Sequence, residues 1–191
     1  MNRILILALL LLPSLAHAHP GHGIADFSGG LIHPFLGLDH LMAAVAVGLW
    51  AAQLGGISRW ALPLSFVGAM GLGLVCGLGG YSPAGIETCI VMTILILGAM
   101  VAAAVRLNTG IAALLVAGCA FFHGLAHGLE AQAADAAGYA AGLFLSTALL
   151  HIAGVCVGVC LLSAGRSRLL RAAGAGVFMA GIWCGIVLIG S

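Results

Sequence analysis

The sequence contains no lysine and has few charged residues of any kind. Its 191 residues include six arginines and five acidic residues, so charged side chains make up only 6% of the chain. A soluble domain of this size usually carries about 25% charged residues. The shortage excludes an ordinary soluble globular domain, a disordered chain, and a nucleic-acid-binding protein, which needs a basic surface. Without lysine the chain also has no P-loop, whose lysine contacts nucleotide phosphates.

Apolar residues take the place of the missing charges. Hydrophobic residues make up 63% of the chain, and the mean hydropathy is +1.24. The apolar runs lack the alternation of polar and apolar residues that is typical of outer-membrane barrels. The 30 glycines lie mostly inside these runs, as is typical of helices that pack closely in lipid. We therefore expect an all-α, polytopic membrane protein.

The first 18 residues have the pattern of a signal peptide. Arg3 supplies a positive charge, the apolar stretch over residues 4–12 is too short to span a membrane, and Ala16-His17-Ala18 offers a small-x-small cleavage site. We expect cleavage after Ala18, or after Ala16, which fits the same pattern. The remaining residues, 19–191, then form a single transmembrane domain in the bacterial inner membrane, with the N-terminus on the periplasmic side.

Six apolar segments follow, each of about 20 residues and long enough to cross a hydrocarbon core of roughly 30 Å. They lie near 34–55, 60–80, 84–105, 109–129, 138–163 and 171–190. With the N-terminus outside, every arginine of the mature chain falls in a cytoplasmic connection, as the positive-inside rule requires. These arginines are Arg59, Arg106, Arg166, Arg168 and Arg171.

Histidine is common in this chain, with eight residues, and the first span begins with the sequence HPFLGLDH over residues 33–40. Ionisable groups inside a membrane are costly, so they usually face an interior path. On a regular helix His33 and His40 would lie about 10 Å apart along the axis and form two separate stations. A break at Pro34 or Gly37 would instead bring them together. Asp39 would either orient a histidine or bind an ion itself.

The fourth span carries FHGLAHGLE over residues 122–130. His123 and His127 are one helical turn apart, and Glu130 lies on the same face. Two histidines at this spacing chelate divalent metals, and an added carboxylate gives nitrogen and oxygen donors suited to Ni²⁺, Co²⁺ or Zn²⁺. Gly124 and Gly128 form a small-xxx-small pair that lets another helix approach. One helix therefore offers both ligands and a packing surface.

Three further histidines are weaker metal candidates. His151 in the fifth span fits a hydrogen-bonding partner between helices better than it fits a ligand. His19 and His22, near the new N-terminus, would either capture metal outside the membrane or belong to an exposed tail without such a role.

The two motifs together resemble those of the HupE/UreJ family of nickel and cobalt permeases. The resemblance covers the whole mature chain and includes Met42, Gly48 and Trp50 after the first motif. It implies a signal peptide, six spans, and uptake of Ni²⁺ or Co²⁺, often serving the maturation of hydrogenase or urease. The positions that match the family motifs are His33, Asp39, His40, His123, His127 and Glu130.

The expected function is that of a secondary permease, not an enzyme. It would import Ni²⁺ or Co²⁺ through the intramembrane His, Asp and Glu side chains, with lipid around it, no nucleic-acid partner and no prosthetic group. Two alternatives stay open: a membrane metal sensor or accessory protein, and an electron-transfer protein whose paired histidines ligate haem. An intramembrane hydrolase is less consistent with the sequence, because no Gly-x-Ser-x-Gly elbow is present.

Overall fold

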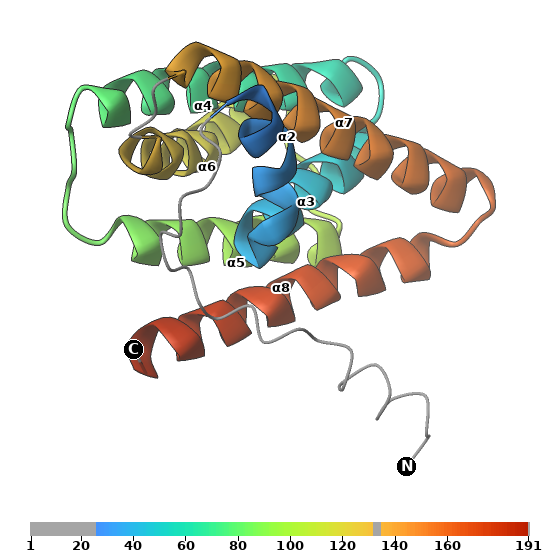
Figure 1. Cartoon of the computed structure of the whole chain (residues 1–191). Coiled ribbons are helices and arrows are strands. Elements are labelled where there is room, and N and C mark those ends of the chain that lie inside the picture. The colour runs from blue at the N-terminus through green and yellow to red at the C-terminus, as the bar shows by residue number, and fades with distance from the viewer. Residues whose placement is uncertain (1–25, 132–134, 191) are drawn as a thin grey trace.

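The computed structural model describes residues 26–131 and 135–190, so the expected signal peptide, His19 and His22 lie outside the described part. Within these two ranges the chain forms seven helices and no strands (Figure 1), which confirms the all-α prediction. The helices are α2 (Phe27–Leu36), α3 (Leu38–Leu54), α4 (Ser58–Leu78), α5 (Ile86–Ala103), α6 (Thr109–Glu130), α7 (Ala136–Ser163) and α8 (Ser167–Gly190).

Five of these helices, α4 to α8, are each long and apolar enough to cross a membrane. The pair α2 and α3 passes the same test together, but the two helices are bent by 83° relative to each other. The five single-helix spans expected from the sequence agree with the structure to within four residues at each end. The first span differs, because its helical region begins earlier, at Phe27, and breaks in the middle.

The break in the first span lies at Gly37, whose extended backbone (φ −89°, ψ 114°) ends α2 and precedes α3. Pro34 has no N–H group, so it already weakens the hydrogen bonding of the last turn of α2. A Cβ atom at position 37 would lie only 2.8 Å from Asp39 Oδ1 and 3.0 Å from His40 Nδ1. Glycine at this position therefore gives the Asp39–His40 pair the room that any larger residue would take.

Glycines bring the helices into backbone contact. A Cβ atom at Gly124 of α6 would overlap the carbonyl oxygen of Met70 in α4, and a Cβ at Gly48 of α3 would overlap the backbone of α7 near His151. Gly98 of α5 approaches α8 in the same way. Apolar side chains gain little by leaving lipid, so close van der Waals contact of this kind is a main source of stability between spans.

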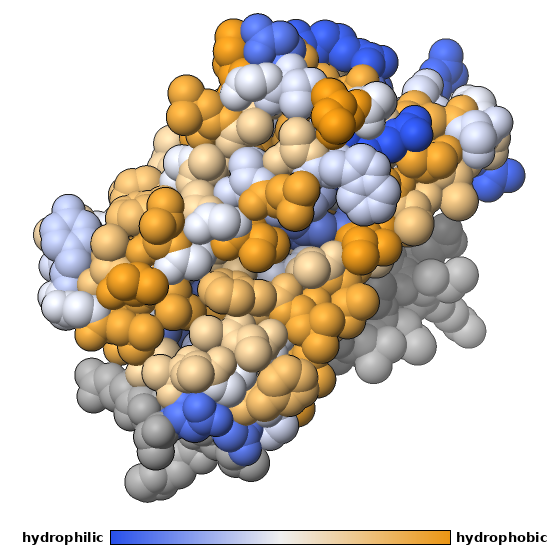
Figure 2. Space-filling model, turned by 90° about the horizontal axis from the view of Figure 1, so that it is seen from above, coloured by the Kyte–Doolittle hydropathy of each residue, from blue (hydrophilic) through white to orange (hydrophobic). Residues whose placement is uncertain are grey.

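Helix α3 contacts every other described helix and runs through the middle of the molecule (Figure 1). Most of its second half is buried, including Trp50. The outer face drawn in Figure 2 is largely hydrophobic, with hydrophilic residues gathered towards opposite edges. Large apolar side chains such as Leu114, which is 75% exposed, cover the outside, as expected where the neighbouring solvent is lipid.

The arginines of the described residues gather at one end of the bundle. The guanidinium of Arg106 donates to the carbonyl of Gln53, and Arg171 Nε donates to the carbonyl of Ala102 over 2.8 Å. The first bond joins the connection after α5 to the end of α3, and the second joins the end of α5 to the start of α8. Asp26, Glu87, Glu130 and Asp135 lie at the opposite ends of their helices. Basic and acidic groups are thus separated along the bundle axis.

Candidate metal centre

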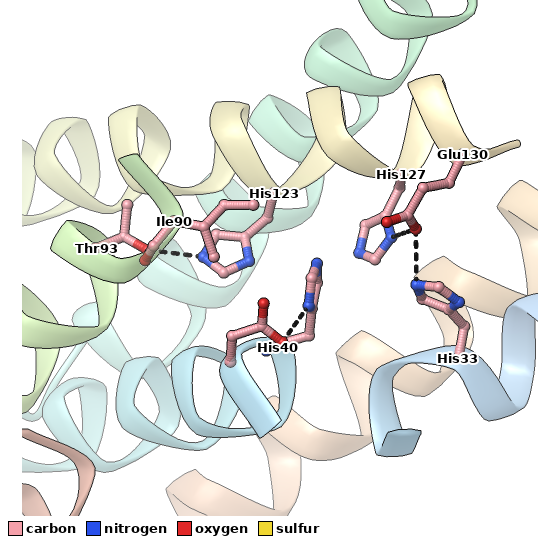
Figure 3. Close-up of polar contacts among 8 residues, drawn as sticks. His33, His40, Ile90, Thr93, His123, His127 and Glu130 are labelled. Carbon is pink, nitrogen blue, oxygen red and sulfur yellow. Dashed lines mark hydrogen bonds and ion pairs between the residues drawn. The ribbon is translucent and has the colours of Figure 1, made fainter. Parts of the chain in front are cut away.

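Four histidine rings from three helices meet inside the bundle near its acidic end. Two come from the bent first span, His33 at the end of α2 and His40 at the start of α3, and two come from α6, His123 and His127. Ring centroids are 4.2 Å apart for His40 and His127, 4.9 Å for His40 and His123, and 4.8 Å for His33 and His127. Figure 3 shows these rings facing one another between the helices.

The bend at Gly37 decides which of the two sequence alternatives holds for the first motif. The ring centroids of His33 and His40 are 5.9 Å apart, far less than the separation along a straight helix. Because α3 turns away from α2 by 83°, both rings reach the same interior region from different directions. Because of the break, His33 and His40 lie close together and do not form two separate binding positions.

The outer part of the cluster combines His33, His127 and Glu130. Glu130 Oε2 lies 3.2 Å from His33 Nε2 and 4.0 Å from His127 Nδ1. One ligand atom from each of the three residues lies within 4.8 Å of the others, which is close enough for a shared metal ion. The side chain of Glu130 is 52% exposed while that of His127 is 1% exposed, so this group leads from the surface to the interior.

The inner part of the cluster contains His40 and His123. Asp39 Oδ1 lies 2.8 Å from His40 Nδ1. A carboxylate oxygen accepts hydrogen bonds, so Nδ1 of His40 carries a proton, and in the neutral ring Nε2 keeps its lone pair. Of the two roles considered for Asp39, the contact in the structure is the one that orients a histidine.

Several imidazole nitrogens at the centre make no hydrogen bond within the described chain. His40 Nε2, His123 Nδ1 and His127 Nδ1 are buried and have no hydrogen-bond partner among the described residues. The same three rings line a small cavity of about 10 Å³ together with Phe66 and Met70. Unpaired polar atoms are costly in an apolar interior, and a space this small suits an ion or a water molecule, not an organic substrate.

The α6 motif is divided differently from what its spacing predicts. His127 and Glu130 join His33, whereas His123 turns towards His40 and towards Thr93 of α5, whose Oγ1 lies 2.8 Å from His123 Nε2. The structure therefore does not place His123, His127 and Glu130 together as one chelating group. Two adjoining groups of donors replace it, and the contacting rings of His40 and His127 connect them.

His151 lies apart from the cluster. It is fully buried on α7, and its ring packs edge-on against Phe66 with centroids 4.8 Å apart. Neither of its ring nitrogens has a hydrogen-bond partner in the part of the chain that the structure describes. The hydrogen bond between helices that the sequence favoured is thus wrong for these residues.

Two residues of α5 belong to the surroundings of the cluster although sequence reasoning gave them no role there. Glu87 is near enough to interact electrostatically with His40, Asp39 and Glu130. Thr93 contacts His123 directly. Neither residue stands at a metal-binding spacing from a histidine, so the only available signal was the presence of polar residues in an apolar span.

The chain matches a family of known proteins over a range that includes both histidine motifs. The family model described as HupE / UreJ protein matches residues 7–184. This chain belongs to the HupE/UreJ family. The resemblance stated from the two motifs is therefore confirmed, and the family is associated with nickel and cobalt transport.

A relative shows how far the similarity extends along the chain. Protein HupE of Rhizobium leguminosarum bv. viciae is 44% identical to this chain over 178 residues, which cover 92% of each sequence. The family match over residues 7–184 takes in helices α2 to α7 and most of α8. No solved structure matches the chain.

Proposed function

We propose that this protein is a secondary permease that imports Ni²⁺ or Co²⁺ across the bacterial inner membrane. The observation that carries the proposal is the meeting of four imidazoles, with the carboxylates of Asp39 and Glu130 beside them, in a largely apolar helical bundle. Three buried ring nitrogens there have no hydrogen-bond partner among the described residues. Imidazole and carboxylate donors suit these borderline metals. Ionisable groups within a membrane protein usually mark an ion pathway.

The proposed path runs from the acidic end inwards. The ion is first held by His33, His127 and Glu130, whose exposed carboxylate offsets part of the charge. It then passes to His40 and His123, whose neutral imidazoles replace water molecules bound to the ion without adding positive charge. His127 touches both His33 and His40, so it serves as the link between the two positions. The weaker candidates His19 and His22 would supply a first encounter outside, and His151 a later one beyond Phe66.

The membrane potential can drive this import without another energy source. A potential of 100 mV, negative inside, favours the inward movement of one charge by about 2.3 kcal/mol and of a divalent ion by about twice that. At about 1.4 kcal/mol per factor of ten, this corresponds to roughly three decades of accumulation at equilibrium. Facilitated diffusion is therefore sufficient for nickel uptake at low external concentration.

Uptake of radioactive Ni²⁺ tests the proposal directly. We expect a nickel-transport-deficient bacterium that expresses this protein to accumulate Ni²⁺ from nanomolar medium at least 10 times faster than the same cells with an empty vector. Excess Co²⁺, Zn²⁺ or Cu²⁺ is added in parallel, and the order of competition identifies the preferred metal. Absence of uptake by protein shown to be in the membrane contradicts the proposal.

Uptake by cells, together with metal binding and absorption spectra of the purified protein, separates the alternatives. A metal sensor or accessory protein binds Ni²⁺ in its purified form but does not accelerate uptake by cells. A haem protein shows a Soret band after purification. A permease shows saturable uptake and no such band.

Reporter fusions test the proposed orientation. With a periplasmic N-terminus and six spans, the C-terminus is periplasmic and the arginine-rich end is cytoplasmic. Alkaline phosphatase, which folds to its active form only outside the cytoplasm, should be active when fused after Ser191 and inactive when fused at Gly165, between α7 and α8. The reverse pattern of activities would show that the bundle is inserted the other way round.

A further inference from the structure

Thr93 is the polar side chain through which α5 contacts the histidine cluster. It is 4% exposed, and its Oγ1 makes two short contacts. One is to the carbonyl oxygen of Ile90 over 2.7 Å, and the other is to Nε2 of His123 over 2.8 Å. Figure 3 shows the contact between Thr93 and His123, on the side of the His123 ring that faces away from His40.

The number of protons in this arrangement fixes which nitrogen of His123 is protonated. A threonine hydroxyl has one hydrogen to donate. The carbonyl oxygen of Ile90 can only accept, so the hydroxyl hydrogen points to Ile90. The hydroxyl oxygen must then accept from His123, which requires a proton on Nε2. His123 Nδ1 is left with its lone pair.

Nδ1 of His123, the ring nitrogen that keeps its lone pair, lies at the cavity where a metal ion could bind. Nδ1 is buried and has no hydrogen-bond partner among the residues that the structure describes. The ring of His40, whose own Nδ1 is tied to Asp39, lies 4.9 Å away between centroids. One histidine thus presents Nδ1 and the other presents Nε2, each held by a bond at the opposite ring nitrogen. Both rings line the same small cavity.

We infer that Thr93 is a positioning residue for the metal path, because it holds His123 in the Nε2-protonated tautomer and turns Nδ1 towards the ion. This inference rests on the proposed transport function and adds to it a residue outside the two histidine motifs. Partners of this kind fix the tautomer and the ring direction of metal-binding histidines, and their loss typically costs 10–100-fold in metal affinity or activity.

Three variants separate the hydroxyl from the shape of the side chain. Thr93→Val keeps the branched shape and removes the hydroxyl. Thr93→Ser keeps the hydroxyl and removes the methyl group. Thr88→Val makes the same change as the first variant at an exposed position of α5.

Co²⁺ titration of the purified full-length protein in detergent, followed by visible absorption, reports metal affinity. We expect Thr93→Val to weaken Co²⁺ binding by 10–100-fold, while Thr93→Ser and Thr88→Val stay within about threefold of wild type. Equal affinity of Thr93→Val and wild type would overturn the inference. So would a Thr93→Ser variant as weak as Thr93→Val, because the loss would then come from packing.

Nitrogen NMR of protein with ¹⁵N-labelled histidine tests the same point without metal. The His123 signals, assigned by their loss in His123→Gln, should show one tautomer protonated at Nε2 in wild type and a mixture of tautomers or ring positions in Thr93→Val. Protonation at Nδ1 in wild type would overturn the inference. This result stands even if uptake fails, so failure of the transport proposal and failure of the role of Thr93 can be distinguished.

Discussion

Replacing His127 with alanine is expected to abolish saturable nickel uptake, with a loss of about 100-fold or more at equal amounts of protein in the membrane. The reason is the place of this ring within the cluster. His127 shares the outer group with His33 and Glu130, and its ring also contacts that of His40 in the inner group. The variant therefore removes a donor from both positions and interrupts the link between them.

The control for this variant is Leu129→Ala, which shortens a half-buried side chain in the same turn of α6 without removing a metal donor. We expect it to retain more than half of the wild-type uptake. A second variant, His127→Gln, largely fills the space of the ring but lacks a basic nitrogen, and it should be as inactive as His127→Ala. Normal uptake by either His127 variant at matched expression would show that the ion does not use this residue.

Replacing Gly124 with alanine is expected to destabilise the protein and to reduce uptake at least 10-fold. The added Cβ would overlap the carbonyl oxygen of Met70, a backbone atom that cannot move without shifting α4. Overpacking of this kind typically costs about 1–3 kcal/mol, more than the gain of up to about 1 kcal/mol from the higher helix propensity of alanine. Because Gly124 directly follows His123, separation of α4 and α6 also displaces the ligands.

Gly118→Ala is the matched control, since a Cβ atom at Gly118 of the same helix has open space around it. Thermal unfolding in detergent, followed by circular dichroism or by loss of the monodisperse peak, measures the difference. We expect a lower midpoint for Gly124→Ala and an unchanged or slightly higher midpoint for Gly118→Ala. Equal midpoints for the two variants would show that the contact between α4 and α6 is less tight than the structure indicates.

The sequence by itself determined the class of the protein and the positions of most spans. Runs of apolar residues and the shortage of charge are local properties, and a helix of about 20 residues must satisfy its own backbone when it lies in lipid. For the same reason five spans could be placed to within a few residues. The arginines of the described chain marked one end, because each lies in a connection or near the start of the helix that follows it, and the side of the connections alternates along the chain.

The sequence also indicated which side chains to watch, because spacing within one helix fixes their relative direction. The approach of His127 to Glu130 follows from their separation of three residues. The same rule could not show that His33, from another helix, would share that carboxylate. Nor could it show that His123 would turn away from this group.

Only the tertiary structure decided how the donors are divided. The extended backbone at Gly37 redirects α3 and brings His40 next to His33, and this depends on room that only a glycine leaves beside Asp39. The distance between α6 and α4 is set by backbone contact at Gly124. Thr93 reaches His123 across 30 residues of sequence. Periodicity predicts which residues share a face of one helix, whereas distances between helices depend on how closely their backbones pack.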